Sequence, residues 1–252
     1  MKCVAFNQSK IYYEVVGAGQ PILFIHPPGL GRLVFHYQSP LCQQFKLIMP
    51  DLSGHGASTA PYQRNIIKQY CQEIEAILDQ ENINSVIICA YSAGGIVAQI
   101  FASQYANRVN ALIVSGGFPK VSTQLLRSIY IAGMLIIDHS SHFLANRLAA
   151  SNAQDEEQKQ RLKQHINKSD VLKWAQFYHN TYQVDIRHYV KQIACPSLFI
   201  YGDTRDFTHY YAKLYRSQPH IQLAYVDDGS HQIPAKKPDV FNQLIINFVK
   251  HV

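Results

Sequence analysis

The sequence lacks a hydrophobic run long enough to cross a membrane. Its longest apolar stretch, Ile129 to Ile137, includes Gly133 and is far shorter than the roughly 20 residues that a membrane helix requires. The first residues, Met1 to Phe6, do not form the apolar core of a signal peptide. These features predict a soluble cytoplasmic protein without a membrane partner.

Cysteine and charge are also sparse. The five cysteines are odd in number and lack the short paired spacing of a zinc site, so we expect small buried thiols in a reducing compartment and no metal. Charged residues make up 16% of the chain, and the formal net charge of +6 is scattered. The densest polar stretch, Asp155 to Lys163, mixes both signs and is typical of a solvated helix face. A nucleic-acid partner is therefore not expected.

Short apolar runs alternate with helical patterns along most of the chain. With 252 residues, of which 47% are hydrophobic, the chain can bury one large core. This alternation predicts an α/β fold with a mainly parallel sheet covered on both faces, preceded by a hairpin over Val4 to Val16. The predicted buried strands are Pro21–Ile25, Phe45–Met49, Ser85–Cys89, Ala111–Val114, Ser197–Tyr201 and a less apolar edge strand, Ile221–Val226.

The alternation stops in the middle of the chain. Helical patterns near Gln124–Ile137, near Ala153–His165 and from Ser169 to Tyr182 follow one another there without a convincing strand. We therefore expect residues 118–185 to form a helical cap inserted in a core of residues 1–117 and 186–252. Such an insertion is most simply a lid over the edge where parallel sheets bind ligands.

One serine stands in a distinctive local context. The segment Cys89-Ala90-Tyr91-Ser92-Ala93-Gly94-Gly95 follows a predicted strand and opens a predicted helix. A serine in such a turn exposes its hydroxyl beside a backbone N–H that can bind an oxyanion, which is the nucleophile-elbow arrangement. The alternative is a serine that only caps the helix. Ala90 occupies a position that needs a small side chain, because strand and helix cross closely there.

A nucleophilic serine needs a base and an orienting acid. The candidate base is His231, because its loop follows the last predicted strand and reaches the same sheet edge. The loop after Gly202 offers two carboxylates, Asp203 and Asp206. We prefer Asp206 as the acid, and Asp203 remains the alternative; either can instead be a turn residue.

The oxyanion requires backbone N–H donors. Ala93 supplies one, and the second is expected in the loop after the first buried strand, His26-Pro27-Pro28-Gly29-Leu30. Proline has no N–H, so Gly29, or failing it Leu30, is the permitted donor. We expect His26 to be structural, and we expect His55 to belong to the scaffold of the tight turn Asp51–Ser58.

Taken together and in this order, these segments resemble the α/β-hydrolase superfamily with a helical cap. The matching pieces are His26-Pro27-Pro28-Gly29, Asp51-Leu52-Ser53-Gly54-His55-Gly56, Ala90-Tyr91-Ser92-Ala93-Gly94-Gly95, Gly202 to Asp206 and Gly229-Ser230-His231. The resemblance implies that Ser92 is the nucleophile, His231 the base and Ala93 one oxyanion donor. The family acid most often lies where Arg205 stands here, one residue before Asp206.

The predicted function is hydrolysis of a small or medium ester-like acyl substrate, as by a carboxylesterase, without a cofactor. Met134, Trp174, Tyr178 and Tyr182 are candidates for an apolar pocket, or for packing the cap on the core. Alternatives on the same triad are carbon–carbon bond hydrolysis and acyl transfer. A ligand-binding or signalling protein with slow turnover is another. The sequence does not indicate the oligomeric state.

Overall fold

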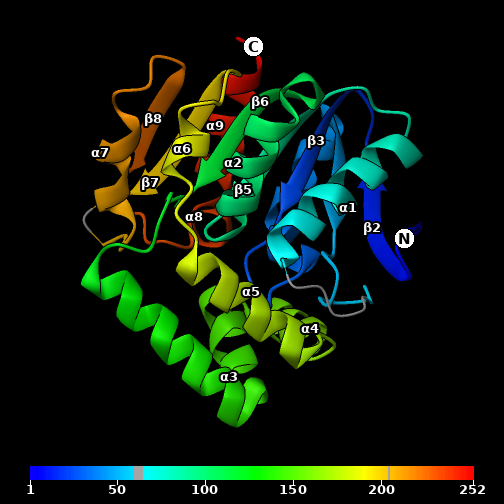
Figure 1. Cartoon of the computed structure of the whole chain (residues 1–252), viewed down its shortest axis with the longest axis vertical. Coiled ribbons are helices and arrows are strands. Elements are labelled where there is room, and N and C mark those ends of the chain that lie inside the picture. Colours follow the sequence, from blue (N-terminus) through cyan, green and yellow to red (C-terminus); the bar gives the residue numbers. More distant parts are fainter. Residues whose placement is uncertain (60–64, 204) are drawn as a thin grey trace.

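The computed structural model describes residues 1–59, 65–203 and 205–252 (Figure 1). Within these residues, one sheet has the spatial order β1-β2-β4-β3-β5-β6-β7-β8. β2 runs antiparallel to β1 and β4, and the pairs from β4 to β8 are parallel, which confirms the predicted mainly parallel sheet. The strands are β1 (Lys2–Phe6), β2 (Ser9–Val16), β3 (Gln20–Ile25), β4 (Phe45–Pro50), β5 (Val86–Tyr91), β6 (Val109–Ser115), β7 (Ser197–Gly202) and β8 (Ile221–Val226).

The predicted hairpin is formed by β1 and β2. Its turn residues Asn7 and Gln8 have φ angles of 44° and 65°, and Phe6 pairs with Ser9 across them. Left-handed angles at both turn positions match the right-handed twist of the two strands. At the other end of the sheet, β8 has partly exposed residues and lies at the edge, as its weaker hydrophobicity predicts.

A separate hydrophobic core covers each face of the sheet. Along β3, Leu23 and Ile25 join the core that contains α1 and α2 residues, whereas Ile22 and Phe24 join the core that contains η1 and α9 residues. Successive side chains of a strand point to opposite faces, so a continuously apolar run is buried on both sides. This is why the central strands read as unbroken apolar runs.

Helical patterns in the sequence near Ile66–Leu78, near Ile96–Tyr105 and from Pro238 predict three core helices, and all three are present, with ends shifted by one or two residues. They are α1 (Ile66–Gln80), α2 (Gly94–Gln104) and α9 (Pro238–Val249). The helical pattern around Cys42 gave no predicted range, and the structure forms η1 there (Arg32–Gln43), in which Pro40 lies inside and Phe35 departs from helical angles. These irregularities remove the helical periodicity on which prediction depends. The shorter elements are η2 (Ala106–Arg108), α6 (Arg187–Val190), η3 (His209–Tyr211), α7 (Ala212–Tyr215) and α8 (Ile233–Lys236).

Three helices fill the predicted insertion between β6 and β7. They are α3 (Gln124–Ser151), α4 (Glu156–Ile166) and α5 (Val171–Gln183), and they begin after side-chain caps on Thr123, Asp155 and Asp170. The predicted end of the first helix at Ile137 and the predicted start of the second near Ala153 are wrong. The backbone of α3 leaves helical angles at Ser140 and then becomes helical again. The apolar periodicity shifts at this break, so the sequence pattern indicates a helix end where the helix in fact continues.

The two ends of the insertion lie side by side. The N–H of Ile186 donates to the carbonyl of Pro119 (2.9 Å), and Lys120 forms an ion pair with Asp185 (3.2 Å). Figure 1 places α3, α4 and α5 together beyond one end of the strands. We propose that residues 118–185 are a cap on a core of residues 1–117 and 186–252.

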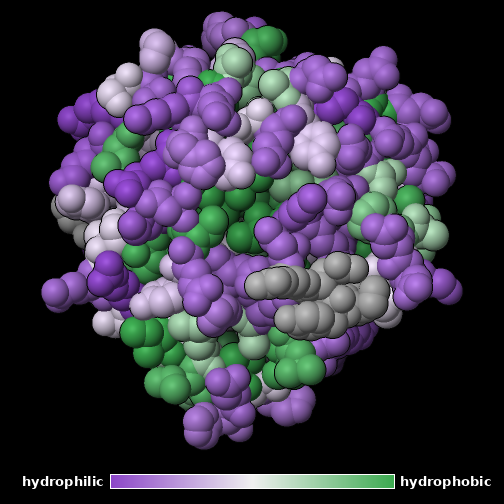
Figure 2. All heavy atoms as spheres, in the orientation of Figure 1, coloured by the Kyte–Doolittle hydropathy of each residue, from purple (hydrophilic) through white to green (hydrophobic). Residues whose placement is uncertain are grey.

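Apolar side chains are exposed on the cap. Leu125 and Leu135 of α3 are 59% and 56% exposed, and Leu172 of α5 is 79% exposed. Figure 2 shows hydrophobic residues over the lower part of the visible face, where Figure 1 places α3. None of the helices in the described ranges has both the length and the hydropathy needed to span a membrane.

The cysteines are free thiols, but they are not uniformly buried as the sequence analysis expects. Cys71 and Cys89 are buried in the cores, whereas Cys3 is exposed. Cys3 lies on β1, which is an edge strand of the sheet in the described residues.

Candidate active site

Ser92 lies in the sharp turn between β5 and α2. Its φ angle is 53°, and its N–H donates to the carbonyl of Ser115 at the end of β6 (2.8 Å). A Cβ atom on Gly94 would stand 2.5 Å from the carbonyl oxygen of Ile25, so glycine is required for α2 to begin this close to β3. The turn therefore holds a serine in left-handed backbone geometry at the carboxyl end of a central strand, as a nucleophile elbow does.

His231, in the loop between β8 and α8, bridges this serine and a carboxylate. Its Nε2 is 2.8 Å from Ser92 Oγ, and its Nδ1 is 3.1 Å from Asp206 Oδ1. The ring is 5% exposed and lies against Phe207, with 4.1 Å between ring centroids. Since a carboxylate only accepts hydrogen bonds, the proton belongs on Nδ1, and Nε2 can accept the proton of the serine.

Asp206 is a buried residue of the loop after β7. Its Oδ2 accepts the N–H of Gly202 (3.0 Å), and its Oδ1 accepts the N–H of Thr208 (2.8 Å) in addition to His231. Burial raises the pKa of Asp206, but the hydrogen bonds from His231 and Thr208 outweigh it and lower that pKa to about 2. Asp206 is therefore an ionised acceptor, fixed on both oxygens, at any neutral pH.

Asp203 lies elsewhere, although it is closer to the end of β7. Its carboxylate accepts the N–H groups of Arg205 (3.0 Å) and Asp228 (3.1 Å) at the partly exposed rim of the loop. These backbone hydrogen bonds lower the pKa of Asp203. The structure thus brings Ser92, His231 and Asp206 together and gives Asp203 a turn-forming position.

The sequence analysis did not single out Thr208. Its hydroxyl donates to Asp206 Oδ1 at 2.6 Å and lies 3.3 Å from His231 Nδ1, and the side chain is fully buried. An aspartate whose side chain accepts from the residue two places on forms an Asx turn, and this spacing was the available signal. Thr208 holds the oxygen of Asp206 that faces the imidazole.

The two predicted oxyanion donors differ in placement. Ala93 begins α2 and lines the same cavity as Ser92. Gly29, with φ of 83°, packs against Trp174, whose ring a Cβ would meet at 2.3 Å; Pro27, Pro28 and Leu30 line the cavity in that loop. The Leu30 N–H donates to the carbonyl of Pro27 (3.4 Å). Both donors stay predictions.

A cavity of about 170 Å³ opens beside Ser92. Of the cap residues predicted to line a pocket, Tyr178 does so. Trp174 is buried behind Gly29, Tyr182 packs on Tyr130, and Met134 lines a different hollow, between α3 and α5. The lining residues are Pro27, Pro28, Leu30, Tyr91, Ser92, Ala93, Leu126, Ile129, Tyr130, Leu148, Ser151, Asn152, Tyr178, Phe207, His231 and Gln232.

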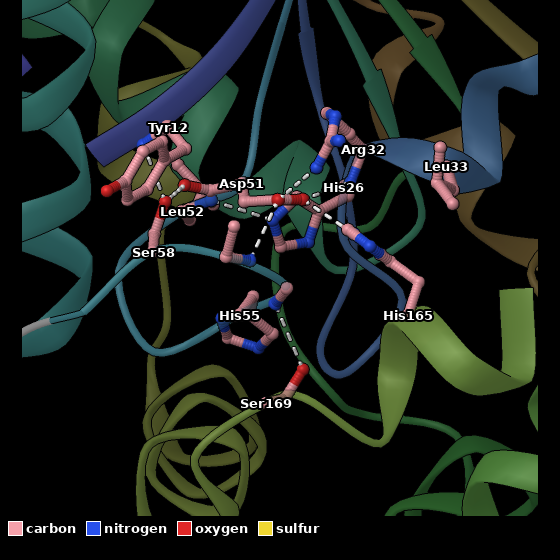
Figure 3. Close-up of polar contacts among 12 residues, drawn as sticks. Tyr12, His26, Arg32, Leu33, Asp51, Leu52, His55, Ser58, His165 and Ser169 are labelled. Carbon is pink, nitrogen blue, oxygen red and sulfur yellow. Dashed lines mark hydrogen bonds and ion pairs between the residues drawn. The ribbon is translucent and has the colours of Figure 1, made fainter. Parts of the chain in front are cut away.

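A second polar network joins the loops after β3 and β4 (Figure 3). His26 is structural, as expected: its Nε2 accepts the N–H of Leu52 (3.0 Å), and burial lowers its pKa to about 4. Asp51 is fully buried, and its carboxylate accepts hydrogen bonds from the backbone N–H groups of Arg32 (2.8 Å) and Ala57 (3.1 Å). The same carboxylate forms an ion pair with the guanidinium group of Arg32. These bonds tie the loops after β3 and β4 into one unit.

The cap is attached to the same network. His165, on α4, places its Nε2 2.8 Å from Asp51 Oδ1, and Ser169 Oγ accepts the N–H of Gly56 (3.2 Å; Figure 3). The N–H of Asp170 donates to the carbonyl of Gly54 (2.9 Å). The sequence analysis missed His165 because its partner lies 114 positions away along the chain.

A buried carboxyl on α1 predicts a pH-dependent stability. Glu73 is fully buried and accepts hydrogen bonds from the Ser53 N–H (3.0 Å) and from Gln69 Nε2 (2.8 Å), near Lys173 of α5. Burial outweighs these bonds and raises the pKa of Glu73 from 4.5 to about 7. The native state therefore binds this proton more tightly than the unfolded chain, so the free energy of unfolding falls as pH rises between these values.

Glu73→Gln keeps the shape and cannot ionise. We expect the free energy of unfolding of this variant not to decrease in this way. Between about pH 5 and pH 8, the difference in stability between the variant and the wild type should therefore shift in favour of the variant by on the order of 3 kcal/mol. Urea unfolding at the two pH values measures the difference. Glu75→Gln, at a half-buried position two residues later in the same helix, is the matched control. Equal pH slopes for the wild type and Glu73→Gln would contradict the prediction.

The fold and the site together define a known class. In this class a mainly parallel sheet carries a serine in the sharp turn after a central strand and a histidine in the loop after the last strand. The family described as the alpha/beta hydrolase fold matches residues 20–237. The chain therefore belongs to the α/β hydrolase fold family, which confirms the predicted resemblance.

Individual relatives are distant. The putative carbamate hydrolase RutD of Azorhizobium caulinodans is 22% identical over 259 residues, which cover 96% of each chain. The enol-lactonase from Burkholderia xenovorans has a TM-score of 0.84 at 19% identity, over 99% of this chain and 100% of that chain. A thermophilic esterase from Thermogutta terrifontis has a TM-score of 0.84 at 20% identity, over 99% and 98%. At these identities, the likeness to the two structures establishes the fold alone.

Proposed function

We propose that this protein is a cofactor-independent serine hydrolase that cleaves small or medium ester-like acyl substrates. The observation that carries the proposal is the hydrogen-bonded series from Ser92 through His231 to Asp206, with separations of 2.8 and 3.1 Å. A serine hydroxyl becomes a strong nucleophile when a base takes its proton and a carboxylate orients that base. The three side chains supply the nucleophile, the base and the orienting acid.

In the first half of the proposed reaction, Ser92 Oγ bonds to the acyl carbon while its proton passes to His231 Nε2. The carbonyl oxygen becomes an oxyanion, which the N–H of Ala93 at the start of α2 stabilises. The bond to the leaving group then breaks, the leaving group takes the proton from His231, and an acyl-serine remains. A water molecule then gives a proton to His231 and attacks the acyl carbon. The bond between that carbon and Ser92 Oγ breaks, Oγ takes the proton back from His231, and the acid is released.

The side chains that line the cavity favour a neutral substrate. Among the described residues that line it, His231 is the one acidic or basic side chain, and most of the others are apolar. A charged substrate group would be buried there without an opposite charge, which is costly. The names of the relatives, esterase, enol-lactonase and carbamate hydrolase, support an acyl substrate.

A fluorophosphonate and a short-chain p-nitrophenyl ester together test the proposal. We expect steady multiple turnover of the ester. We expect the fluorophosphonate to abolish this turnover and to add the mass of its phosphonyl group to the peptide that contains Ser92. A single burst without further turnover would identify a binding protein, and analysis of the acyl product would reveal acyl transfer. Labelling of a different residue, or loss of labelling without loss of turnover, would contradict the assignment of Ser92.

A further inference from the structure

Tyr91 ends β5 directly before Ser92, and its side chain is part of the cavity wall. The residue is 2% exposed, and its ring centroid lies 5.4 Å from that of His231. Its hydroxyl has no hydrogen-bond partner in the described chain, and the unpaired side-chain atoms that protein encloses completely belong to other residues. The hydroxyl therefore keeps accessible surface, and because Tyr91 lines the cavity, that surface opens on the space beside Ser92.

A second tyrosine hydroxyl comes from α5. Tyr178 is half-buried and lines the same cavity. The indole N–H of Trp174 lies toward its hydroxyl, and since an indole N–H can only donate, the proton of the Tyr178 hydroxyl remains available. The Tyr178 hydroxyl is also near enough to Tyr91 to contribute to the raised pKa of Tyr91. Tyr91 and Tyr178, the tyrosine pair, thus lie close together in the wall.

Two other hydroxyls of the wall already have partners. Tyr130 donates to Thr181 Oγ1 (3.2 Å), and Ser151 Oγ donates to the carbonyl oxygen of Leu148 (3.0 Å). Apart from the candidate nucleophile, the tyrosine pair therefore supplies the hydroxyls of the described wall that are free to donate to a bound molecule.

The chemistry of the tyrosine pair restricts what it binds. Burial and the charge of Asp206 raise the pKa of Tyr91, and burial raises the pKa of Tyr178 to about 12, so both are neutral donors at neutral pH. A carboxylate would be buried there without a cation other than His231 in the described wall, which is costly. A carbonyl oxygen is neutral and has two lone pairs, which match two donors.

We propose that Tyr91 and Tyr178 are specificity-determining residues that select acyl substrates carrying a second carbonyl oxygen besides that of the scissile ester. This inference rests on the proposed serine-hydrolase function. Because Tyr91 adjoins Ser92, the second carbonyl lies within a few bonds of the scissile carbon. A substrate without it covers the two hydroxyls and leaves them unpaired, and unpaired buried polar groups discriminate strongly between otherwise similar substrates.

The test compares esters in which a ketone and a methyl-branched carbon of similar shape replace one another. On the acyl side, p-nitrophenyl 4-oxopentanoate is compared with p-nitrophenyl 4-methylpentanoate. On the alcohol side, 2-oxopropyl butanoate is compared with 2-methylpropyl butanoate. The quantity measured is the ratio of kcat/KM for the ketone ester to kcat/KM for its branched analogue. The intrinsic reactivity of each ester cancels when the ratio of a variant is divided by that of the wild type.

Tyr91→Phe and Tyr178→Phe each remove one hydroxyl and keep the ring. We expect each variant to lower the ratio by about threefold to tenfold in at least one series, through a loss confined to the ketone ester. Tyr91→Phe should unfold at the wild-type temperature, because it removes no hydrogen bond within the described protein. The matched control is Tyr130→Phe, which removes a hydroxyl of the same wall that donates to Thr181, and which should keep the wild-type ratio.

The outcomes separate the two proposals. A wild-type ratio in either variant overturns the role of that residue and leaves the hydrolase intact. An equal loss with ketone and branched esters also overturns it, since the hydroxyl would then act on the group that all the esters share. If no ester is turned over, the proposed function fails, and titration of Ser92→Ala protein with the same esters still decides the inference: the ketone ester should bind more tightly, and Tyr91→Phe should remove the difference. If Tyr91→Phe does not fold, Tyr178→Phe provides the decision.

Discussion

Replacing Ser92 with alanine is expected to lower kcat/KM for a p-nitrophenyl ester by at least about 10⁴-fold, because the only group proposed to bond to the acyl carbon is removed. Alanine keeps the Cβ atom, so the backbone at φ 53° experiences the same strain as in the wild type. The variant loses one hydrogen bond, that of Ser92 Oγ with His231. Thermal unfolding should therefore show a folded protein, which separates loss of chemistry from loss of structure.

Ser103→Ala is the matched control for this experiment. Ser103 lies on α2, the helix that Ser92 precedes, and its hydroxyl donates to Gln192 at the surface (3.0 Å). This variant should retain the wild-type rate within about twofold, as surface substitutions usually do. Substantial residual turnover in Ser92→Ala, insensitive to fluorophosphonate, would show that another group carries out the reaction.

Asp206→Asn is expected to lower kcat by about 10⁴-fold with a smaller change in KM. An amide nitrogen facing His231 can only donate, so the imidazole would have to accept on Nδ1 and carry its proton on Nε2. In that tautomer Nε2 cannot take the proton of Ser92. The N–H groups of Gly202 and Thr208 each donate to a carboxylate oxygen of Asp206 in the wild type. In the variant, one of these N–H groups would face the amide nitrogen, which cannot accept a hydrogen bond.

Asp203→Asn, three residues earlier in the same loop, should remain within about twofold of the wild type, because Asp203 contacts Arg205 and Asp228 instead of the imidazole. A large loss in Asp203→Asn with little loss in Asp206→Asn would reverse the assignment of the acid. The pKa of Asp206, about 2, lies below the ordinary 3.8, so its ionised form stabilises the folded protein above about pH 4. That contribution is lost as pH falls through about 2.

Much of the fold could be predicted because its signals are local. The central strands appear as short apolar runs since both of their faces are buried, and the α1 and α9 helices show apolar residues on one side. The end of α3 could not be predicted, because the break at Ser140 shifts the periodicity without ending the helix. The range of η1 could not be predicted for a related reason, since it contains Pro40 and an irregular turn at Phe35.

The candidate site divides in the same way. Ser92 and His231 were identified from their positions after predicted strands, since the carboxyl ends of parallel strands meet at one edge of the sheet. The choice between Asp203 and Asp206 was not available from the sequence. Both follow β7 within a few residues, and the backbone of the loop turns Asp206 inward and leaves Asp203 at the rim.

By itself, then, the sequence determined which segments form the sheet, where the candidate nucleophile stands and which histidine can reach it, because these properties depend on neighbours along the chain. Only the tertiary structure decided which carboxylate contacts that histidine and that His165 of α4 binds Asp51 of the core. Each of these depends on a distance of a few ångströms between side chains that are remote in sequence, or on the turn of a short loop, and local patterns do not encode such distances.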